Sequence, residues 1–479
     1  MTTSAETTMS NATPAVAVTP ASANRAALPP RTRAMLEAPI LPTLLRLSAP
    51  NLFFIVSQAA VSIGETYFVG WLGSDALAAI SLVFPVLMLM QTMSGGGIGS
   101  GMASAISRAL GAGRRDDANA LVLVSLLIAA CFGAAFSVAI LMGGRKLFTA
   151  MGGTAAVVDL AESYAVILFS GAILFWIFNA LGSILRGAGI MSPPAVVSMI
   201  GAVIILTVSP ALIVGVGAMP GFGIAGAAIA MLIYYLVGAV ILGIYLLRGD
   251  APVRLVRPGA DAWRLARDVL SVGLPGALNS LVFNSAILVF TALIGPYGTT
   301  ALAGYGVGAR LEYLQIPIVF GLGIGLITMV GTNVGAGLEA RAKTTAWTGA
   351  LIAGAISGGI GLVLALLPHL WVDLFSRDAE VYAAGSRYLQ IVGPAYSFYG
   401  AGLALYFASL GAGRPGWPLA FGCARLVLVV IGGAATVAWF GGGLAWIYAW
   451  MVAGIVLFGL GCILSIYFTP WTNPTQESR

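Results

Sequence analysis

The sequence predicts an all-helical protein that crosses a membrane many times, because of its composition, its repeated apolar runs and the likeness of its two halves. Of its 479 residues, 59% are hydrophobic and 8% are charged. Soluble globular proteins carry roughly 25% charged residues, and so few charges could not cover a soluble fold of this length. The composition therefore indicates a polytopic membrane protein.

Twelve apolar runs are long enough to cross a bilayer, since a membrane helix needs about 20 mostly apolar residues. The runs are continuous and do not alternate with a period of two, which argues against an outer-membrane barrel. The expected spans are 44–70, 76–106, 118–142, 157–183, 194–216, 222–247, 269–295, 300–330, 344–368, 383–408, 417–439 and 444–468.

The basic residues predict the orientation, because cytoplasmic loops are enriched in Lys and Arg. With the N-terminus inside, 17 of the 23 basic residues fall on the inside and 4 on the outside. Arg186 is counted among the inside residues, in the loop after the fourth span. Arg310 and Arg425 remain within helices. We therefore expect a multi-pass protein of the cytoplasmic (inner) membrane with both termini in the cytoplasm.

The two halves of the chain resemble each other in register. LGAGRRDDA (Leu110–Ala118) reappears as VGAGLEARA (Val334–Ala342), and RGAGIMSPP (Arg186–Pro194) reappears as LGAGRPGWP (Leu410–Pro418), both at an offset of 224 residues. Six helices in each half give both halves the same topology. The repeats are therefore parallel, as in secondary transporters whose two bundles rock about a cavity at the membrane midplane.

The repeat divides the chain into two lobes with short flanking segments. Residues 1–43 are rich in Ala, Thr and Pro and are expected to form a disordered cytoplasmic tail. The N-lobe (helices 1–6) spans 44–248, a cytoplasmic linker 249–268, and the C-lobe (helices 7–12) 269–468. Residues 469–479 form a second cytoplasmic tail.

Three stretches are similar to the multidrug and toxic compound extrusion (MATE) family: SAPNLFFIVSQAAVSIGETYFVGWLGSDALAAISL, AISRALGAGRRDDA and LRGAGIMSPP. The resemblance runs from about Leu44 to Phe468. It implies a twelve-helix antiporter that exports cationic or amphipathic organic compounds (drugs, toxins) in exchange for protons or sodium ions. The same superfamily includes flippases for lipid-linked sugars, so a lipid-linked or anionic substrate is the alternative.

Glu65 is an acid inside the first apolar run, where a charge costs about 2.5–3.5 kcal/mol on insertion scales. It lies five residues before Gly70, roughly 7–8 Å from the end of the helix. Removing water from a carboxylate disfavours its charged form, which suits reversible protonation. The resemblance implies an acid here, usually Asp. We expect Glu65 to carry cation coupling; a purely structural bond to nearby hydroxyls is the alternative.

The fifth helix departs from the family pattern, which commonly has an Asn and an Asp four residues apart before a Pro. The matching positions are Ile205 and Ser209, before Pro210. Thr207 and Ser209 still offer oxygens, so sodium at Glu65 stays open. With a single embedded carboxylate in this lobe, a proton is the simpler counter-ion.

A second candidate site for an ion or for the substrate lies in GARLEYLQIP (Gly308–Pro317). Arg310 and Glu312 are two residues apart and point to different sides of a straight helix. We therefore do not expect them to pair, and a structural role for Arg310 is the alternative. The helix 7 acid of some family branches is missing, and that helix offers Asn279 and Asn284 instead.

Further polar or amphipathic residues are candidates for the wall of the substrate cavity, although each could instead line a contact between helices. The glycine-rich SGGGIGSG (Ser94–Gly101) allows either bending or close helix packing. Pro85 and Pro317 are expected kink sites. The candidate cavity residues are Gln58, Tyr67, Gln91, Asn179, Thr207, Ser209, Asn279 and Asn284.

The sequence argues against an enzyme. One His and three scattered Cys offer no metal or catalytic cluster, so no cofactor or metal is expected. The arginines lie between apolar runs without stacking aromatics, which argues against a nucleic-acid partner. We expect a monomer whose partners are a small organic substrate, a proton or sodium counter-ion and membrane lipid. A duplicated membrane scaffold that transports nothing is the remaining alternative.

Overall fold

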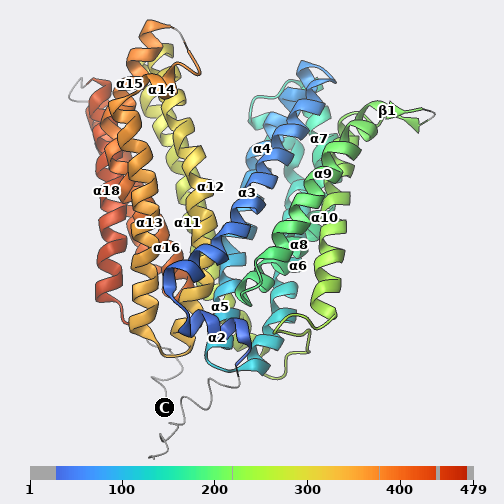
Figure 1. Ribbon diagram of the computed structural model, residues 1–479. Helices are drawn as coiled ribbons and strands as arrows, with labels where there is room; N and C mark the ends of the chain where they lie inside the picture. Colours follow the sequence, from blue (N-terminus) through green and yellow to red (C-terminus); the bar gives the residue numbers. More distant parts are fainter. Residues whose placement is uncertain (1–27, 218, 377, 438–442, 472–479) are drawn as a thin grey trace, which may run out of the picture.

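The computed structural model describes residues 28–217, 219–376, 378–437 and 443–471, which are almost entirely helical (Figure 1). Within these ranges, 11 helices are long and apolar enough to cross a membrane, or up to 12 if the bent pair α7 and α8 counts as one span. The prediction of an all-helical membrane protein is confirmed.

The N-lobe begins with α3 and ends with α10. Two short antiparallel strands, β1 and β2, join α9 to α10. The second span runs without interruption from α4 through the π-helix η1 into α5. The elements are α3 (Ile40–Gly70), α4 (Ser74–Thr92), η1 (Met93–Ile98), α5 (Gly99–Gly111), α6 (Arg115–Ala150), α7 (Ala155–Ser170), α8 (Ala172–Gly187), α9 (Ser192–Val214), β1 (Gly215–Val216), β2 (Met219–Pro220) and α10 (Ile224–Leu247).

The C-lobe repeats this order of long helices. Here α15, η3 and α16 together form one span. The elements are α11 (Ala262–Ile294), η2 (Gly295–Tyr297), α12 (Thr299–Gly335), α13 (Glu339–Leu366), α14 (His369–Val372), α15 (Ala379–Val392), η3 (Gly393–Ala395), α16 (Tyr396–Gly411), α17 (Gly416–Ala435) and α18 (Leu444–Phe468).

Each lobe has its own hydrophobic core. Leu265 and Val269, from the start of α11, nevertheless belong to the N-lobe core, while Leu44 and Ala103 belong to the C-lobe core. The lobes thus pack together at the end of the molecule that carries α2 and the linker, which we call the linker end. They diverge toward the opposite end, the diverging end (Figure 1).

Close backbone approach holds the lobes together at the linker end. A Cβ atom on Gly97 would lie 2.6 Å from the Cα atom of Ala277 in the other lobe, so a larger residue there would push the lobes apart. In a second contact between the lobes, of α5 with α16, the Ser104 hydroxyl donates to the carbonyl oxygen of Leu410 at 2.6 Å. The glycine-rich segment of the second span therefore packs closely, and it overlaps the π-helix η1.

The structure differs from the expected disordered tail at 1–43. Residues 1–27 lie outside the described residues, but Pro30–Glu37 forms helix α2 and α3 begins at Ile40. Met35 and Leu36 are buried. The segment is too short and polar to signal a helix by itself, and its order comes from contacts with both lobes.

Two other segment boundaries, at the linker and at the C-terminal tail, differ from those expected from the sequence. Helix α11 begins at Ala262, inside the segment expected to be linker, and its first turn is held by ion pairs from Arg264 to Asp117 and Asp261. In the expected C-terminal tail, Trp471 is buried and its backbone N–H donates to Glu339. Residues 472–479 lie outside the described residues.

Candidate functional site

Glu65 of α3 is buried inside the N-lobe, where the side chain of Tyr164 from α7 reaches it. The residue is 6% exposed, and the hydroxyl of Tyr164 donates a hydrogen bond to its carboxylate at 2.6 Å. Tyr164 is itself buried. A charge-assisted bond of this kind offsets part of the cost of burying a carboxylate. The acid expected inside the first span thus has a specific partner, which the sequence had not indicated.

Two neighbouring tyrosines of α10 lie near polar residues of the inter-lobe region. Tyr235 lies within electrostatic range of Glu65, and its hydroxyl is close to the side chain of Gln91. The hydroxyl of Tyr234 donates to the side-chain oxygen of Gln58 at 3.5 Å. Tyr235 thus lies within electrostatic range of Glu65 and close to Gln91, while Tyr234 contacts Gln58.

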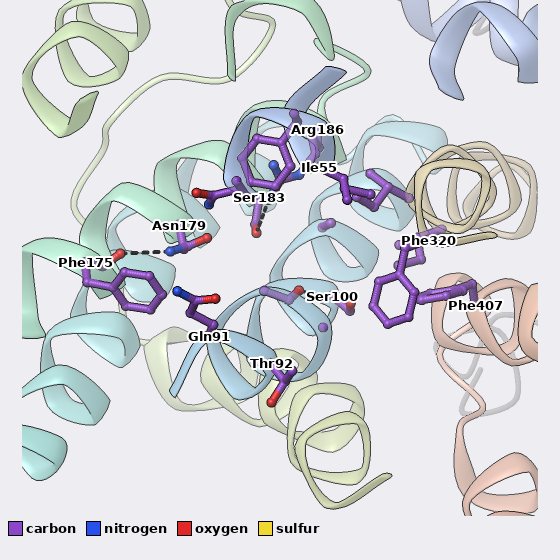
Figure 2. Close-up of a pocket in the computed structure, with 18 residues that line it drawn as sticks. Ile55, Gln91, Thr92, Ser100, Phe175, Asn179, Ser183, Arg186, Phe320 and Phe407 are labelled. Carbon is purple, nitrogen blue, oxygen red and sulfur yellow. Dashed lines mark hydrogen bonds between the residues drawn. The ribbon is translucent and has the colours of Figure 1, made fainter. Parts of the chain in front are cut away.

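Gln58 and Gln91 line a cavity of about 260 Å³ between the lobes, which we call the central cavity (Figure 2). Helices α3, α4, η1, α5 and α8 supply one side, and α12 and α16 supply the other. Its lining residues are Phe54, Ile55, Gln58, Gln91, Thr92, Gly95, Gly96, Gly99, Ser100, Ala103, Phe175, Asn179, Ser183, Arg186, Phe320, Ile324, Ile327 and Phe407.

The walls of the central cavity differ in chemistry. Gln91 and Asn179 of the N-lobe lie on one side, and Phe320 and Phe407 of the C-lobe lie on the other (Figure 2). The two phenylalanine rings meet edge to face with centroids 4.8 Å apart. Amides facing aromatic rings provide both hydrogen bonding and apolar contact, as ligand sites typically do.

Arg186 is the charged residue of this lining, which contains no carboxylate. It is 5% exposed; its Nη2 donates to the Ser183 hydroxyl at 3.1 Å, and its guanidinium lies 5.2 Å from the centroid of the Phe54 ring. The expectation that Arg186 lies in a cytoplasmic loop is wrong, because α8 continues to Gly187 and carries Arg186 into the contact between the lobes.

One sequence signal could have identified Arg186. At the offset of 224 residues, its counterpart in the second half is Leu410. A charge present in one repeat and absent from the other is not required by the shared scaffold, and the same holds for Glu65.

The remaining cavity candidates lie elsewhere. Tyr67 is 63% exposed and packs on Phe68 and Trp71. Thr207 and Asn284 hydrogen bond to the backbone of their own helices. Ser209 and Asn279 are 1% exposed, and neither lines the central cavity. A single sequence does not show which face of each apolar helix turns toward the other lobe.

The C-lobe holds a second group, formed by the half-buried Glu312 and two buried tyrosines. Its carboxylate accepts hydrogen bonds from Tyr388 at 2.7 Å and from Tyr396 at 3.4 Å, and the two hydroxyls are 3.2 Å apart. Arg310 lies apart from this group, with its guanidinium 4.9 Å from the centroid of the Phe375 ring. As expected from their spacing, the two charged residues of α12 form no salt bridge within the described part of the chain.

Arg425 of α17 also faces this group. It is 7% exposed, lies over the Phe283 and Tyr399 rings and is within electrostatic range of Glu312. Its Nε and Nη1 atoms have no hydrogen-bond partner among the residues that the structure describes. In the same part of the chain, no group of three or more His, Cys, Asp or Glu side chains is arranged to hold a metal ion.

Known proteins resemble both the sequence and the fold. The MatE family model matches residues 50–211 and 275–434, one match in each lobe. A FAD transporter of Shewanella oneidensis is 29% identical over 398 residues, covering 83% of this chain and 88% of that protein. The probable multidrug resistance protein NorM of Thermotoga maritima is 25% identical over 355 residues, covering 73% of this chain and 75% of that protein.

A solved structure of a MATE protein in its bent conformation has the same fold. It superposes with a TM-score of 0.84 at 23% identity, covering 92% of this chain and 97% of that one. The family model matches the two lobes separately, in agreement with the internal repeat. The chain therefore belongs to the MatE family of transporters.

Proposed function

We propose that this MATE transporter is a secondary active antiporter that exports amphipathic organic compounds in exchange for protons. The observation that carries the proposal is the buried Glu65–Tyr164 pair, with Tyr235 within electrostatic range of Glu65 and close to Gln91 of the central cavity. A carboxyl that binds and releases a proton is a coupling site, and a cavity between two lobes that meet at one end is a substrate site for alternating access.

Most basic residues are expected on the cytoplasmic side of the membrane. This supports placing the linker end of the molecule in the cytoplasm. The structure then represents a state that faces outward, with the lobes closed on the cytoplasmic side. In our mechanism Glu65 takes up a proton from the outer side. Its contact with Tyr164 then changes, and α3 transmits that change to α12, which it meets where Leu52 packs against Gly321. The protein would next open toward the cytoplasm, release the proton and bind substrate.

A proton suits Glu65 better than sodium does. Sodium is a hard cation that prefers several oxygen ligands, whereas the described neighbours hold Glu65 through one hydroxyl. Thr207 bonds to the backbone of its own helix instead of turning to the carboxylate.

Glu312 is our candidate for a second coupling site, in the C-lobe. Its partner Tyr388 follows Tyr164 by 224 residues (388 − 164), the offset of the repeat. Each lobe thus pairs a repeat-related tyrosine with a carboxylate, although the two acids come from different helices of their lobes. The basic residue near this group is Arg425, whereas Arg310 lies apart from it.

The direct test of Glu65 is transport in proteoliposomes with an imposed pH gradient. We expect Glu65→Gln to abolish pH-driven efflux, because the amide cannot exchange a proton, while folding and membrane insertion remain intact. Asp75→Asn is the matched control, because Asp75 is an exposed carboxyl of the neighbouring helix α4.

A parallel assay with an imposed sodium gradient distinguishes the two counter-ions. Full pH-driven transport by Glu65→Gln, at an equal amount of reconstituted protein, would rule out this residue as the coupling site. Efflux that depends on the sodium gradient and not on the pH gradient would show that the counter-ion is sodium and not a proton.

The relatives do not agree on a substrate, since one is described as a FAD transporter and others as multidrug export proteins. The substrate class therefore has to be argued from the central cavity itself.

A further inference from the structure

We propose that the central cavity binds an aromatic organic anion, whose carboxylate, sulfonate or phosphate group pairs with Arg186 and whose ring packs on Phe320 and Phe407. This inference rests on the proposed transport function and specifies its substrate class. It runs against an organic cation, which the family resemblance had suggested, because the lining of the cavity has a positive charge and no acid.

Arg186 is an incomplete ion pair. It is 5% exposed, and its hydrogen-bond acceptor among the described residues is the neutral Ser183 hydroxyl. The structure describes no carboxylate within salt-bridge distance of it. A buried charge without a counter-charge is costly, and a bound anion would supply that counter-charge. The planar guanidinium matches a carboxylate or phosphate with two parallel N–H donors.

The other walls define the rest of the ligand. Phe320 and Phe407 offer edge and face contacts to a planar ring from the C-lobe side (Figure 2). Gln91 and Asn179 offer amide donors and acceptors from the opposite side. An aromatic ring with polar substituents and one anionic group satisfies all three surfaces. A cation would be repelled by Arg186 and would find no carboxylate in the lining, only neutral oxygens and aromatic rings.

The charge of the substrate also sets the response to voltage. Exporting a monovalent anion while importing one proton moves two positive charges inward per cycle. Exporting a monovalent cation for one proton moves none. A membrane potential that is negative inside therefore drives the first exchange and leaves the second unaffected.

Binding is tested on the purified full-length protein with three probes that share one ring system: naphthalene-2-sulfonate, 2-naphthamide and (2-naphthylmethyl)trimethylammonium. We expect the sulfonate to bind most tightly in calorimetric titrations. Arg186→Gln should weaken its binding about 10- to 100-fold, the range expected for a hydrogen bond to a charged group, and leave the amide nearly unchanged. Arg267→Gln, which removes an exposed charge of α11, is the matched control and should change neither.

A second variant tests the charge of the cavity without altering Arg186, in case Arg186→Gln does not fold. Gln91→Glu is nearly isosteric and places a carboxylate in the same lining, so sulfonate binding should fall and binding of the trimethylammonium probe should rise. The proposal is overturned if the wild-type protein prefers the ammonium probe or binds all three equally. It is also overturned if neither variant changes the preference.

Proteoliposomes then provide an independent readout, with potassium gradients and valinomycin setting the potential. Efflux of the sulfonate should accelerate under a potential negative inside. Cation efflux driven by pH but insensitive to voltage, without sulfonate efflux, would overturn this inference and leave the proposed antiporter intact. Voltage-driven sulfonate efflux that ignores both the pH gradient and Glu65→Gln would support the substrate class and refute the coupling role of Glu65.

Discussion

Glu65 and Tyr164 are 99 residues apart in the chain, and the fold brings their oxygen atoms to 2.6 Å. The acid was identifiable from the sequence because a carboxylate inside an apolar run is rare and costly. Its partner was not, because Tyr164 is one of 15 tyrosines and none of them is unusual in a membrane helix. Only the folded arrangement, which brings the Tyr164 hydroxyl to Glu65, distinguishes Tyr164.

The hydroxyl of Tyr164 can be tested by itself. Tyr164→Phe keeps the ring but removes the hydrogen bond to Glu65, a bond to a charged group worth about 1.5–3 kcal/mol. We expect the initial rate of pH-driven transport to fall about 10-fold or more, measured in proteoliposomes.

Tyr448→Phe is the control for this substitution, because the Tyr448 hydroxyl is buried and has no partner among the described residues. Equal rates for the two variants would contradict a role for the Tyr164 hydroxyl in coupling.

At the scale of elements, helix α2 is the main departure from expectation. The side chain of Asn333 donates to the carbonyl oxygen of Met35 at 3.2 Å, and Arg341 donates to the carbonyl of Ala38. The Met35 side chain also packs beside Gly189 of the N-lobe. Helix α2 thus contacts both lobes at the linker end and stabilises their closed contact there.

Removing α2 should ease opening at the linker end. We expect deletion of residues 1–38 to increase the labelling rate of a cysteine introduced by Ser104→Cys about two- to fivefold, with Cys131, Cys423 and Cys462 first replaced by alanine. Ser104 lies buried in the contact between the lobes, and losing the few hydrogen bonds of α2 amounts to about 1 kcal/mol.

Deletion of residues 1–27 is the matched control, since it leaves α2 in place, and it should leave the labelling rate unchanged. The stabilising role of α2 would be refuted if both deletions gave the rate of the full chain.

At the scale of the whole molecule, an ion pair joins the lobes at the linker end. Arg108 of α5 donates to Asp268 of α11 at 3.0 Å, and the two side chains are 8% and 35% exposed. Because Arg108 is buried, removing its partner would leave a charge with little water around it, which is costlier than losing a surface pair. The pair therefore favours the state in which the linker end is closed.

Asp268→Asn should shift the lobes toward opening at the linker end. We expect a longer mean distance between spin labels at Asp116 and Thr344, two exposed positions on the linker-end segments of the two lobes, measured by pulsed electron paramagnetic resonance. Asp261→Asn breaks an exposed pair with Arg264 nearby and serves as the control. An unchanged distance distribution in Asp268→Asn would show that the pair does not hold the closed state.

The sequence by itself determined the class of fold and the family. Composition, apolar run length and basic residues are properties of single segments, and the repeat is a property of the order of segments along the chain. Each of these properties can be read from the sequence without knowing which residues are in contact. Glu65 could also be identified from the sequence, because the free-energy cost of placing a charge in a membrane helix depends mainly on its depth and little on its neighbours.

Only the tertiary structure decided which residues share a site. It united Gln58, Gln91 and Asn179 with Arg186 in the central cavity, and it placed Thr207 and Asn284 against their own helices. In a chain this apolar, almost every helix is hydrophobic all round, so periodicity does not mark the face that turns inward. Contacts between helices that are distant in the sequence determine that face. The same contacts bury Arg186, which the sequence had indicated to be part of a loop.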